Sequence, residues 1–252
     1  MTLAALVLAG SRPGSVDPVA AAEGVAHKAL VVVGGKPLLT RVVEALREAG
    51  IVRIAVAAND PEVMALAAAL GAELVPPQAG PSASVGTAFV HMGAPLLVTT
   101  ADHALLRPEW VRDFVGDVPE GTDAAVLLAS RSAVEQALPG SRRTWLRLAD
   151  GDWSGCNLFL MSTPKAMAAI EAWRAVEADR KRPWKIAARF GLRPLWLYIT
   201  GRLTSDGAIS LLGRRVGINA HAIAARDGLA AVDVDKPSDL ADVRRITAQD
   251  QG

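Results

Sequence analysis

The sequence predicts an α/β fold: a mainly parallel, doubly wound sheet of Rossmann-like type with helices on both faces. Over roughly the first 130 residues, short apolar runs typical of buried strands alternate with longer segments in which apolar residues have helical spacing. Glycine or proline separates most of these segments. Because a helix is the usual crossover between two parallel strands, this alternation favours parallel strands covered by helices.

The elements are expected in the following order. Apolar runs predict strands at residues 3–8, 52–57, 73–75, 96–99 and 124–128. Helical spacing predicts helices at 38–49, 61–70, 82–92 and 108–115, the third of them capped by a serine at its start. After residue 130 the alternation is less regular, with strands expected at 145–148, 157–161, 195–199 and 230–234, and helices at 164–177, 206–215 and from Pro237 onward.

Composition and charge exclude several classes of protein. The 252-residue chain is 51% hydrophobic with a net charge of +1, so it can bury a sizeable core and has no charge excess suited to nucleic acid. No apolar run is long enough for an integral membrane segment. The single cysteine, Cys156, cannot form an intramolecular disulfide, which fits a cytoplasmic location. We expect it to be a small buried residue rather than a nucleophile.

The first strand leads into a loop that can bind phosphate. Residues 9–14 read AGSRPG, and the backbone N–H groups of such a glycine-bearing loop can cradle phosphate oxygens. Arg12 and Lys28 would neutralise the remaining charge. The alternative is an ordinary strand-to-helix turn. Neither a Walker A pattern nor G-x-G-x-x-G is present, which argues against a P-loop or a dinucleotide site.

Taken together, the motifs resemble the MobA-like nucleotidyltransferase superfamily, whose sheet is of the nucleotide-diphospho-sugar transferase type. In chain order they are Leu8-Ala9-Gly10, Arg12, Gly14, Lys28, Gly35-Lys36-Pro37-Leu38-Leu39, Ser82-Ala83-Ser84-Val85, Thr100-Ala101-Asp102, Gly155-Cys156-Asn157 and residues 232–240. Three features depart from the family pattern: Ser11 replaces a glycine, His27 replaces the proline before the lysine, and the spacer between Arg12 and Lys28 is long.

The resemblance implies a Mg²⁺-dependent enzyme that transfers a nucleoside monophosphate from a nucleoside triphosphate to a small phosphorylated acceptor and releases pyrophosphate. CMP is slightly preferred as the transferred group. The resemblance assigns catalytic roles to Arg12, Lys28 and Asp102. The residues it places at the nucleotide are Leu8, Ala9, Gly10, Ser11 and Gly14, with Asn59 and Ser84 expected near the base.

Three aspartates are candidates for the metal: Asp102, and either Asp233 or Asp235 as a second ligand. Asp102 follows the strand expected at 96–99, at the carboxyl end where open α/β sheets bind ligands, and Mg²⁺ prefers carboxylate oxygens. The alternative is that Asp102 only caps a loop. Asp233 and Asp235 lie two apart on an expected strand and would share one face. The resemblance favours Asp233 as the second ligand, although residues 235–239 also fit a helix start.

The acceptor side is less familiar. Residues 180–185 read RKRPWK, and we expect Arg182 and Lys185 to bind an anionic acceptor, unless the run is a solvated surface. The resemblance places Asn157 near the acceptor. We expect one domain over 1–252, with a nucleotide-binding part at about 1–130 and an acceptor-binding part at about 131–230, and a homodimer is an open alternative.

The sequence leaves three other functions as alternatives. Molybdopterin guanylyl or cytidylyl transfer is the nearest alternative within the class. A nucleotide-sugar-dependent glycosyltransferase would need D-x-D after the central strand, but Asp102 is followed by His103 and Ala104. A non-catalytic nucleotide-binding regulator would have less need of both the carboxylates and the cationic loop.

Overall fold

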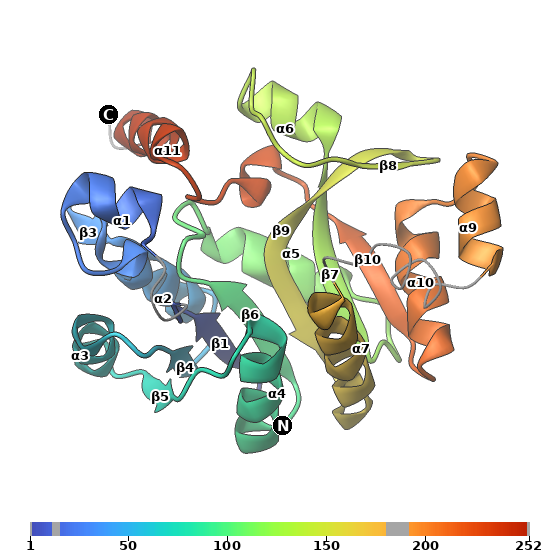
Figure 1. Ribbon diagram of the computed structural model, residues 1–252, viewed down its shortest axis with the longest axis horizontal. Helices are drawn as coiled ribbons and strands as arrows, with labels where there is room; N and C mark the ends of the chain where they lie inside the picture. The colour runs from blue at the N-terminus through green and yellow to red at the C-terminus, as the bar shows by residue number, and fades with distance from the viewer. Residues whose placement is uncertain (1, 12–15, 180–191, 251–252) are drawn as a thin grey trace.

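The computed structural model describes residues 2–11, 16–179 and 192–250 and centres on an eight-stranded sheet (Figure 1). The strands of this sheet are β1 (Ala4–Leu8), β4 (Arg53–Ala57), β5 (Glu73–Val75), β6 (Leu96–Thr100), β7 (Ala124–Ser130), β8 (Leu146–Leu148), β9 (Gly151–Met161) and β10 (Ala220–Ala224). Their order is β10-β7-β9-β6-β1-β4-β5, and β8 pairs with β9 outside that path. A small second ribbon joins β2 (Val32–Val33) to β3 (Lys36–Pro37).

Helices surround this sheet. The α-helices are α1 (Pro18–Glu23), α2 (Leu38–Glu48), α3 (Pro61–Ala69), α4 (Pro81–Met92), α5 (Pro108–Asp117), α6 (Arg131–Ala137), α7 (Met167–Ala178), α9 (Leu192–Ile199), α10 (Ser205–Arg215) and α11 (Pro237–Gln249). Three short 3₁₀ helices are η1 (Lys28–Leu30), η2 (Pro164–Ala166) and η3 (Gly228–Ala231). None of the helices in the described ranges is both long and apolar enough to span a bilayer.

The sheet is mainly parallel, as the sequence predicts. Strand β1 pairs in parallel with β4 and β6, and β10 pairs in parallel with β7. Strand β9 is the exception, because it runs antiparallel to both β6 and β7. The carboxyl ends of β1, β6, β7 and β10 therefore meet along one edge of the sheet, where ligands of open α/β folds bind.

The two faces of the sheet carry separate apolar cores, as strand alternation requires. Ala5 and Val7 of β1 belong to the core that contains α2 and α5, whereas Ala4 and Leu6 belong to the core that contains α4 and α7. All four side chains are almost completely buried. The doubly wound arrangement follows from this pattern, because each face needs its own helical layer.

Three local predictions are wrong. Residues Leu195–Ile199 were expected to be a strand but form the end of helix α9. Residues 230–234 were also expected to be a strand, but η3 ends at Ala231 and an irregular segment follows. Helix α4 has no serine cap: its N-cap is Gly80, and the hydroxyl of Ser82 donates to Glu177 of α7 instead.

Four elements differ from or add to the sequence prediction. Helices α1 and α6 are only six and seven residues long, which is too short to show a clear periodicity. Strand β10 contains three alanines, which have little strand preference. Strand β9 begins at Gly151, six residues before the start expected from its apolar half. The sheet therefore contains a strand that the sequence did not indicate, β10, and a longer β9 than the sequence indicated.

Gly228 allows the closest approach of two elements near the ligand-binding edge. A Cβ atom at this position would lie 2.2 Å from the carbonyl oxygen of Ala133 in α6, a backbone atom that cannot rotate away. We predict that Gly228→Ala lowers the free energy of unfolding by about 1–3 kcal/mol, since overpacking forces the backbone to shift. Urea denaturation followed by circular dichroism measures this change.

Gly116 in α5 provides the matched control. A Cβ atom there meets no heavy atom within 4 Å, so Gly116→Ala should raise stability by about 0.5–1 kcal/mol through helix propensity alone. Equal effects of the two substitutions would contradict the close packing of η3 against α6.

Candidate functional site

The candidate site lies at the carboxyl ends of β1 and β6, in the centre of the sheet. The two strands stay in register to their last residues, Leu8 and Thr100, and the N–H of Ala101 then donates to the carbonyl of Leu8 at 2.9 Å. The chain leaves the sheet there and presents Asp102 just beyond the edge. The expected position of Asp102 after a central parallel strand is thus observed.

Lys28 reaches the same edge from the short helix η1. The backbone N–H of Ala29 donates to Nδ1 of His27 at 3.0 Å, so the imidazole caps η1 and fixes the residue before the lysine. Burial lowers the pKa of His27, which favours the neutral ring that this bond requires. The family's proline is thus replaced by a residue that orders the turn through a hydrogen bond.

The Lys28 ammonium group joins three carboxylates. Its Nζ lies 2.7 Å from Oδ2 of Asp102, 3.2 Å from Oδ1 of Asp235 and 3.9 Å from Oδ2 of Asp17. Burial on its own would lower the pKa of Lys28, but these carboxylates raise it well above its usual value. Lys28 is therefore a permanent positive charge at the edge of the sheet.

Asp102 is held from two sides and also anchors a distant segment. The Thr100 hydroxyl donates to its Oδ1, while Oδ2 takes the Lys28 contact. The carbonyl of Asp102 accepts from the N–H of Val234 at 3.1 Å. This backbone bond brings residues 233–235 to the loop after β6, although more than 130 positions separate the two segments in sequence.

Asp233 and Asp235 turn to different partners, which corrects the expectation that they share one face of a strand. Asp235 contacts Lys28. Asp233 accepts from Arg143 at 2.9 Å and from the side-chain amide of Asn157 at 2.8 Å. Burial raises the pKa of Asp233; Arg143 opposes this effect, and the charges of Asp235 and Asp102 reinforce it. The carboxylates are thus close enough to repel one another.

The arrangement fits a divalent cation. Asp17, Asp102, Asp233 and Asp235 supply four carboxylates against the two cations Lys28 and Arg143, which leaves a surplus of negative charge. Within the described ranges, no group of three or more histidine, cysteine or acidic side chains is placed so that it could hold a metal ion by itself. Mg²⁺ typically takes only one or two protein carboxylates and completes its shell with water and phosphate oxygens, so this donor set suits it.

The first loop is fixed by an amide side chain. Oδ1 of Asn59 accepts from the N–H of Ser11 at 3.1 Å, and its Nδ2 donates to the Ser11 carbonyl at 3.1 Å. Ala9 donates to the carbonyl of Ala57, and a Cβ atom on Gly10 would lie 3.1 Å from Pro77. Leu8, Ala9, Gly10, Ser11 and Asn59 therefore form one connected loop platform. Arg12 and Gly14 lie outside the described residues.

Ser84 is buried and holds a second loop beside this platform. Its hydroxyl donates to the carbonyl of Gly80 at 3.0 Å and accepts from the N–H of Gln78 at 2.8 Å. Its single proton is committed, so the structure gives Ser84 a role in shaping loop 78–80. Contact with a base stays a prediction. The acceptor candidates Arg182 and Lys185 fall outside the described residues.

Asp17, whose carboxylate lies 3.9 Å from Lys28 Nζ, is one site residue that sequence reasoning missed. Arg143 is the other. It lies in the irregular segment before β8, where no periodicity or family motif marks it. The available signal was a pair of arginines directly after Gly140-Ser141. Asn157, by contrast, was expected on the acceptor side, and it lies beside Arg143 on Asp233. Its φ of 49° places it in the left-handed region that asparagine tolerates, at the bulge of β9.

Fold and site define an α/β protein with a charged cluster at the carboxyl ends of its parallel strands, the edge where open α/β sheets bind ligands. Residues 5–202 match the model of the MobA-like NTP transferase domain, and the chain belongs to this family. It is therefore a nucleotidyltransferase, and such enzymes generally use a divalent metal. No curated protein matches the sequence.

Solved structures agree with this assignment. A hypothetical transferase from Thermus thermophilus is 31% identical, with a TM-score of 0.81 over 95% of this chain and 100% of that chain. A CMP:2-keto-3-deoxy-manno-octonic acid synthetase complexed with CTP is 18% identical, with a TM-score of 0.58 over 99% and 100%. The CTP:phosphocholine cytidylyltransferase of Streptococcus pneumoniae is 14% identical, with a TM-score of 0.58 over 98% and 99%. The last two share the fold.

Cys156 is close to the site but unavailable for chemistry. It is 1% exposed, and burial raises the pKa of its thiol to about 12. We predict that Ellman's reagent labels the native protein at pH 8 at least about a hundredfold more slowly than the urea-unfolded protein, because the thiolate is the nucleophile. Absorbance at the thionitrobenzoate band gives both rates. Rapid native labelling would contradict the packing of β9.

Proposed function

We propose that this chain transfers a nucleoside monophosphate, preferentially CMP, from a nucleoside triphosphate to a small phosphorylated acceptor in a Mg²⁺-dependent reaction. The observation that carries the proposal is the Lys28 ammonium group, which lies between Asp102 and Asp235 at the sheet edge. A partly buried, permanently charged lysine suits a triphosphate, and the neighbouring carboxylates suit the cation that accompanies it.

The reaction forms one bond and breaks another at the α-phosphorus. An oxygen of the acceptor phosphate attacks in line, and the bond between the α-phosphorus and its bridging oxygen to the β-phosphorus breaks, so that pyrophosphate leaves. Asp102 and Asp233 would hold the metal, which supplies charge neutralisation on the phosphate oxygens. Lys28 and Arg12 orient the triphosphate, and the platform at residues 8–11 supports it.

The acceptor side is proposed to lie beyond Asp233. Asn157 and Arg143 converge on that carboxylate, and Arg143 is a cation that can also reach an anionic acceptor. Arg182 and Lys185 extend the same chemistry in the proposed acceptor-binding part at about 131–230. CTP is the first nucleotide to test, because two neighbours of this fold are a synthetase complexed with CTP and a CTP:phosphocholine cytidylyltransferase.

We predict that Asp102→Asn lowers kcat for pyrophosphate release at least about a hundredfold, since it removes a charged ligand from the metal. The assay uses each NTP with Mg²⁺ and a panel of phosphorylated acceptors. Asp242→Asn is the matched control, because Asp242 is paired with Arg245 on the surface of α11 and should leave the rate unchanged. Full activity in the folded Asp102 variant contradicts the metal assignment.

Lys28→Met should raise KM for the NTP at least about tenfold, because it removes a charge-assisted contact to the phosphates. The control is Lys36→Met: Lys36 is exposed, pairs with Glu44 and belongs to the motif that follows Lys28. Steady-state kinetics with CTP measures both variants. An unchanged KM in Lys28→Met excludes the proposed triphosphate contact.

A further inference from the structure

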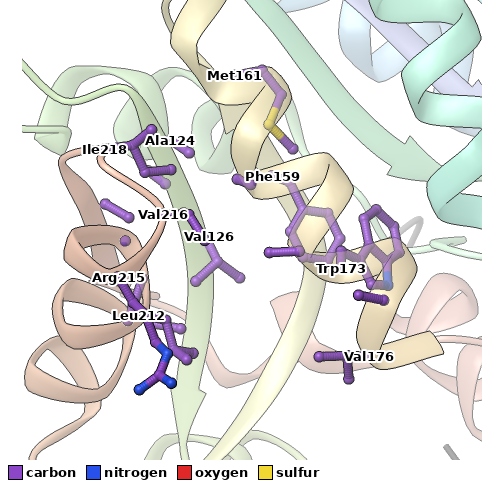
Figure 2. Close-up of a pocket in the computed structure, with 17 residues that line it drawn as sticks. Ala124, Val126, Phe159, Met161, Trp173, Val176, Leu212, Arg215, Val216 and Ile218 are labelled. Carbon is purple, nitrogen blue, oxygen red and sulfur yellow. The ribbon is translucent and has the colours of Figure 1, made fainter. Parts of the chain in front are cut away.

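A cavity of about 580 Å³ lies between helices α7 and α10, on the face of strands β7, β9 and β10 (Figure 2). Val126 and Phe159 form its floor, and Trp173 and Leu212 project into it from the two helices. Trp173 stacks on Phe159 at 5.6 Å, which fixes one wall. The volume is in the range of small-molecule sites.

The lining is almost entirely apolar. Alanine, valine, isoleucine, leucine, phenylalanine and methionine side chains from β7, β9, β10, α7 and α10 make up most of it. Only Trp173 and Arg215 carry a polar side-chain group. A sugar or a nucleobase would lose its hydrogen bonds to water here without replacement, whereas an aliphatic chain gains from leaving water.

The floor of the cavity and the proposed acceptor site share strand β9. Leu158 and Leu160 belong to the core on the opposite face, whereas Phe159 packs on the face of the cavity. Asn157 lies two residues before Phe159, at the bulge of the strand. Phe159 is part of the floor, and two residues earlier the amide of Asn157 donates to Asp233 at 2.8 Å. The apolar floor thus begins two residues from the polar cluster formed by Asn157, Arg143 and Asp233.

Helix α9 adds an independent observation. Trp196, Tyr198 and Ile199 are 55%, 51% and 74% exposed, and the guanidinium of Arg202 lies 5.7 Å from the ring of Trp196. Exposed aromatic side chains beside a cation suit contact with the surface of an anionic amphiphile assembly. The turn after α9 leads directly into α10, which forms a wall of the cavity.

We propose that the acceptor is an amphiphilic phosphate monoester whose aliphatic chain occupies this cavity while its phosphate lies near Asn157 and Asp233. This inference rests on the proposed function and adds the class of its acceptor. Burial of the aliphatic chain supplies the affinity, and the polar cluster formed by Asn157, Arg143 and Asp233 sets the position of the phosphate.

The test compares butyl phosphate with dodecyl phosphate, each below its aggregation concentration, as ligands of the full chain. Isothermal titration calorimetry should show dodecyl phosphate binding at least about a hundredfold more tightly, because each added methylene leaves water. Pyrophosphate release with CTP and Mg²⁺ should show a correspondingly lower KM for dodecyl phosphate.

Ala172→Phe fills the cavity from α7 without adding a polar group. It should weaken dodecyl phosphate binding at least about tenfold, since the aliphatic chain loses its space. The affinity for butyl phosphate should stay unchanged. Arg174→Phe places the same ring on the exposed side of α7 and should change neither value. Circular dichroism confirms that both variants are folded.

Equal affinities for the two phosphates, or an Ala172→Phe variant whose affinity for dodecyl phosphate is unchanged, overturn the inference. So does a change from dimer to monomer in Ala172→Phe without an effect on dodecyl phosphate, since the cavity is then an interface between copies. Equal turnover of the two phosphates contradicts this inference and leaves the proposed function intact. Chain-dependent binding without pyrophosphate release from any NTP supports the chain site and contradicts the proposed function.

Discussion

The contact between Lys28 and Asp102 is the constraint on which the rest of the site depends. It joins the short helix η1 to the loop after the central strand β6, and Val234 extends it to the last part of the chain through the Asp102 carbonyl. A buried lysine costs free energy unless carboxylates compensate for its lost hydration. The cluster satisfies this requirement with three carboxylates. The same contacts stabilise the edge at which we propose that the metal and the triphosphate bind.

Much of the fold could be predicted because local and global signals agree in the first half of the chain. Strands β1, β4, β6 and β7 are apolar runs, and α2 has both a helical period and a glycine after its end. The signals fail where tertiary structure decides. Five consecutive large apolar residues at 195–199 have no period, and they become helical. Val232 and Val234 are apolar too, but their N–H groups donate to the carbonyls of Leu229 and Asp102 rather than to a strand.

The site, like the fold, could be predicted where sequence motifs mark its residues and not where only tertiary contacts bring them together. Lys28, Asp102 and Asp233 belong to ordered motifs, so a family resemblance could locate them. Arg143 could not be located in this way, because its role arises only when the loop before β8 meets a residue 90 positions later. Ser84 and Asn59 show another limit: both lie where a nucleotide site was expected, yet their polar groups hold the loops themselves. In our proposal the polar cluster at the sheet edge binds the phosphates, and the apolar cavity beside Phe159 binds the aliphatic chain of the acceptor.

The most direct test of the central claim is a crystal structure with Mn²⁺ and a non-hydrolysable CTP analogue, with the metal located by anomalous scattering. The account predicts an anomalous peak coordinated by the carboxylates of Asp102 and Asp233 and by phosphate oxygens, with Lys28 Nζ in contact with the triphosphate. A nucleotide bound with its metal away from both carboxylates, and with Lys28 still paired only to Asp102 and Asp235, would contradict it.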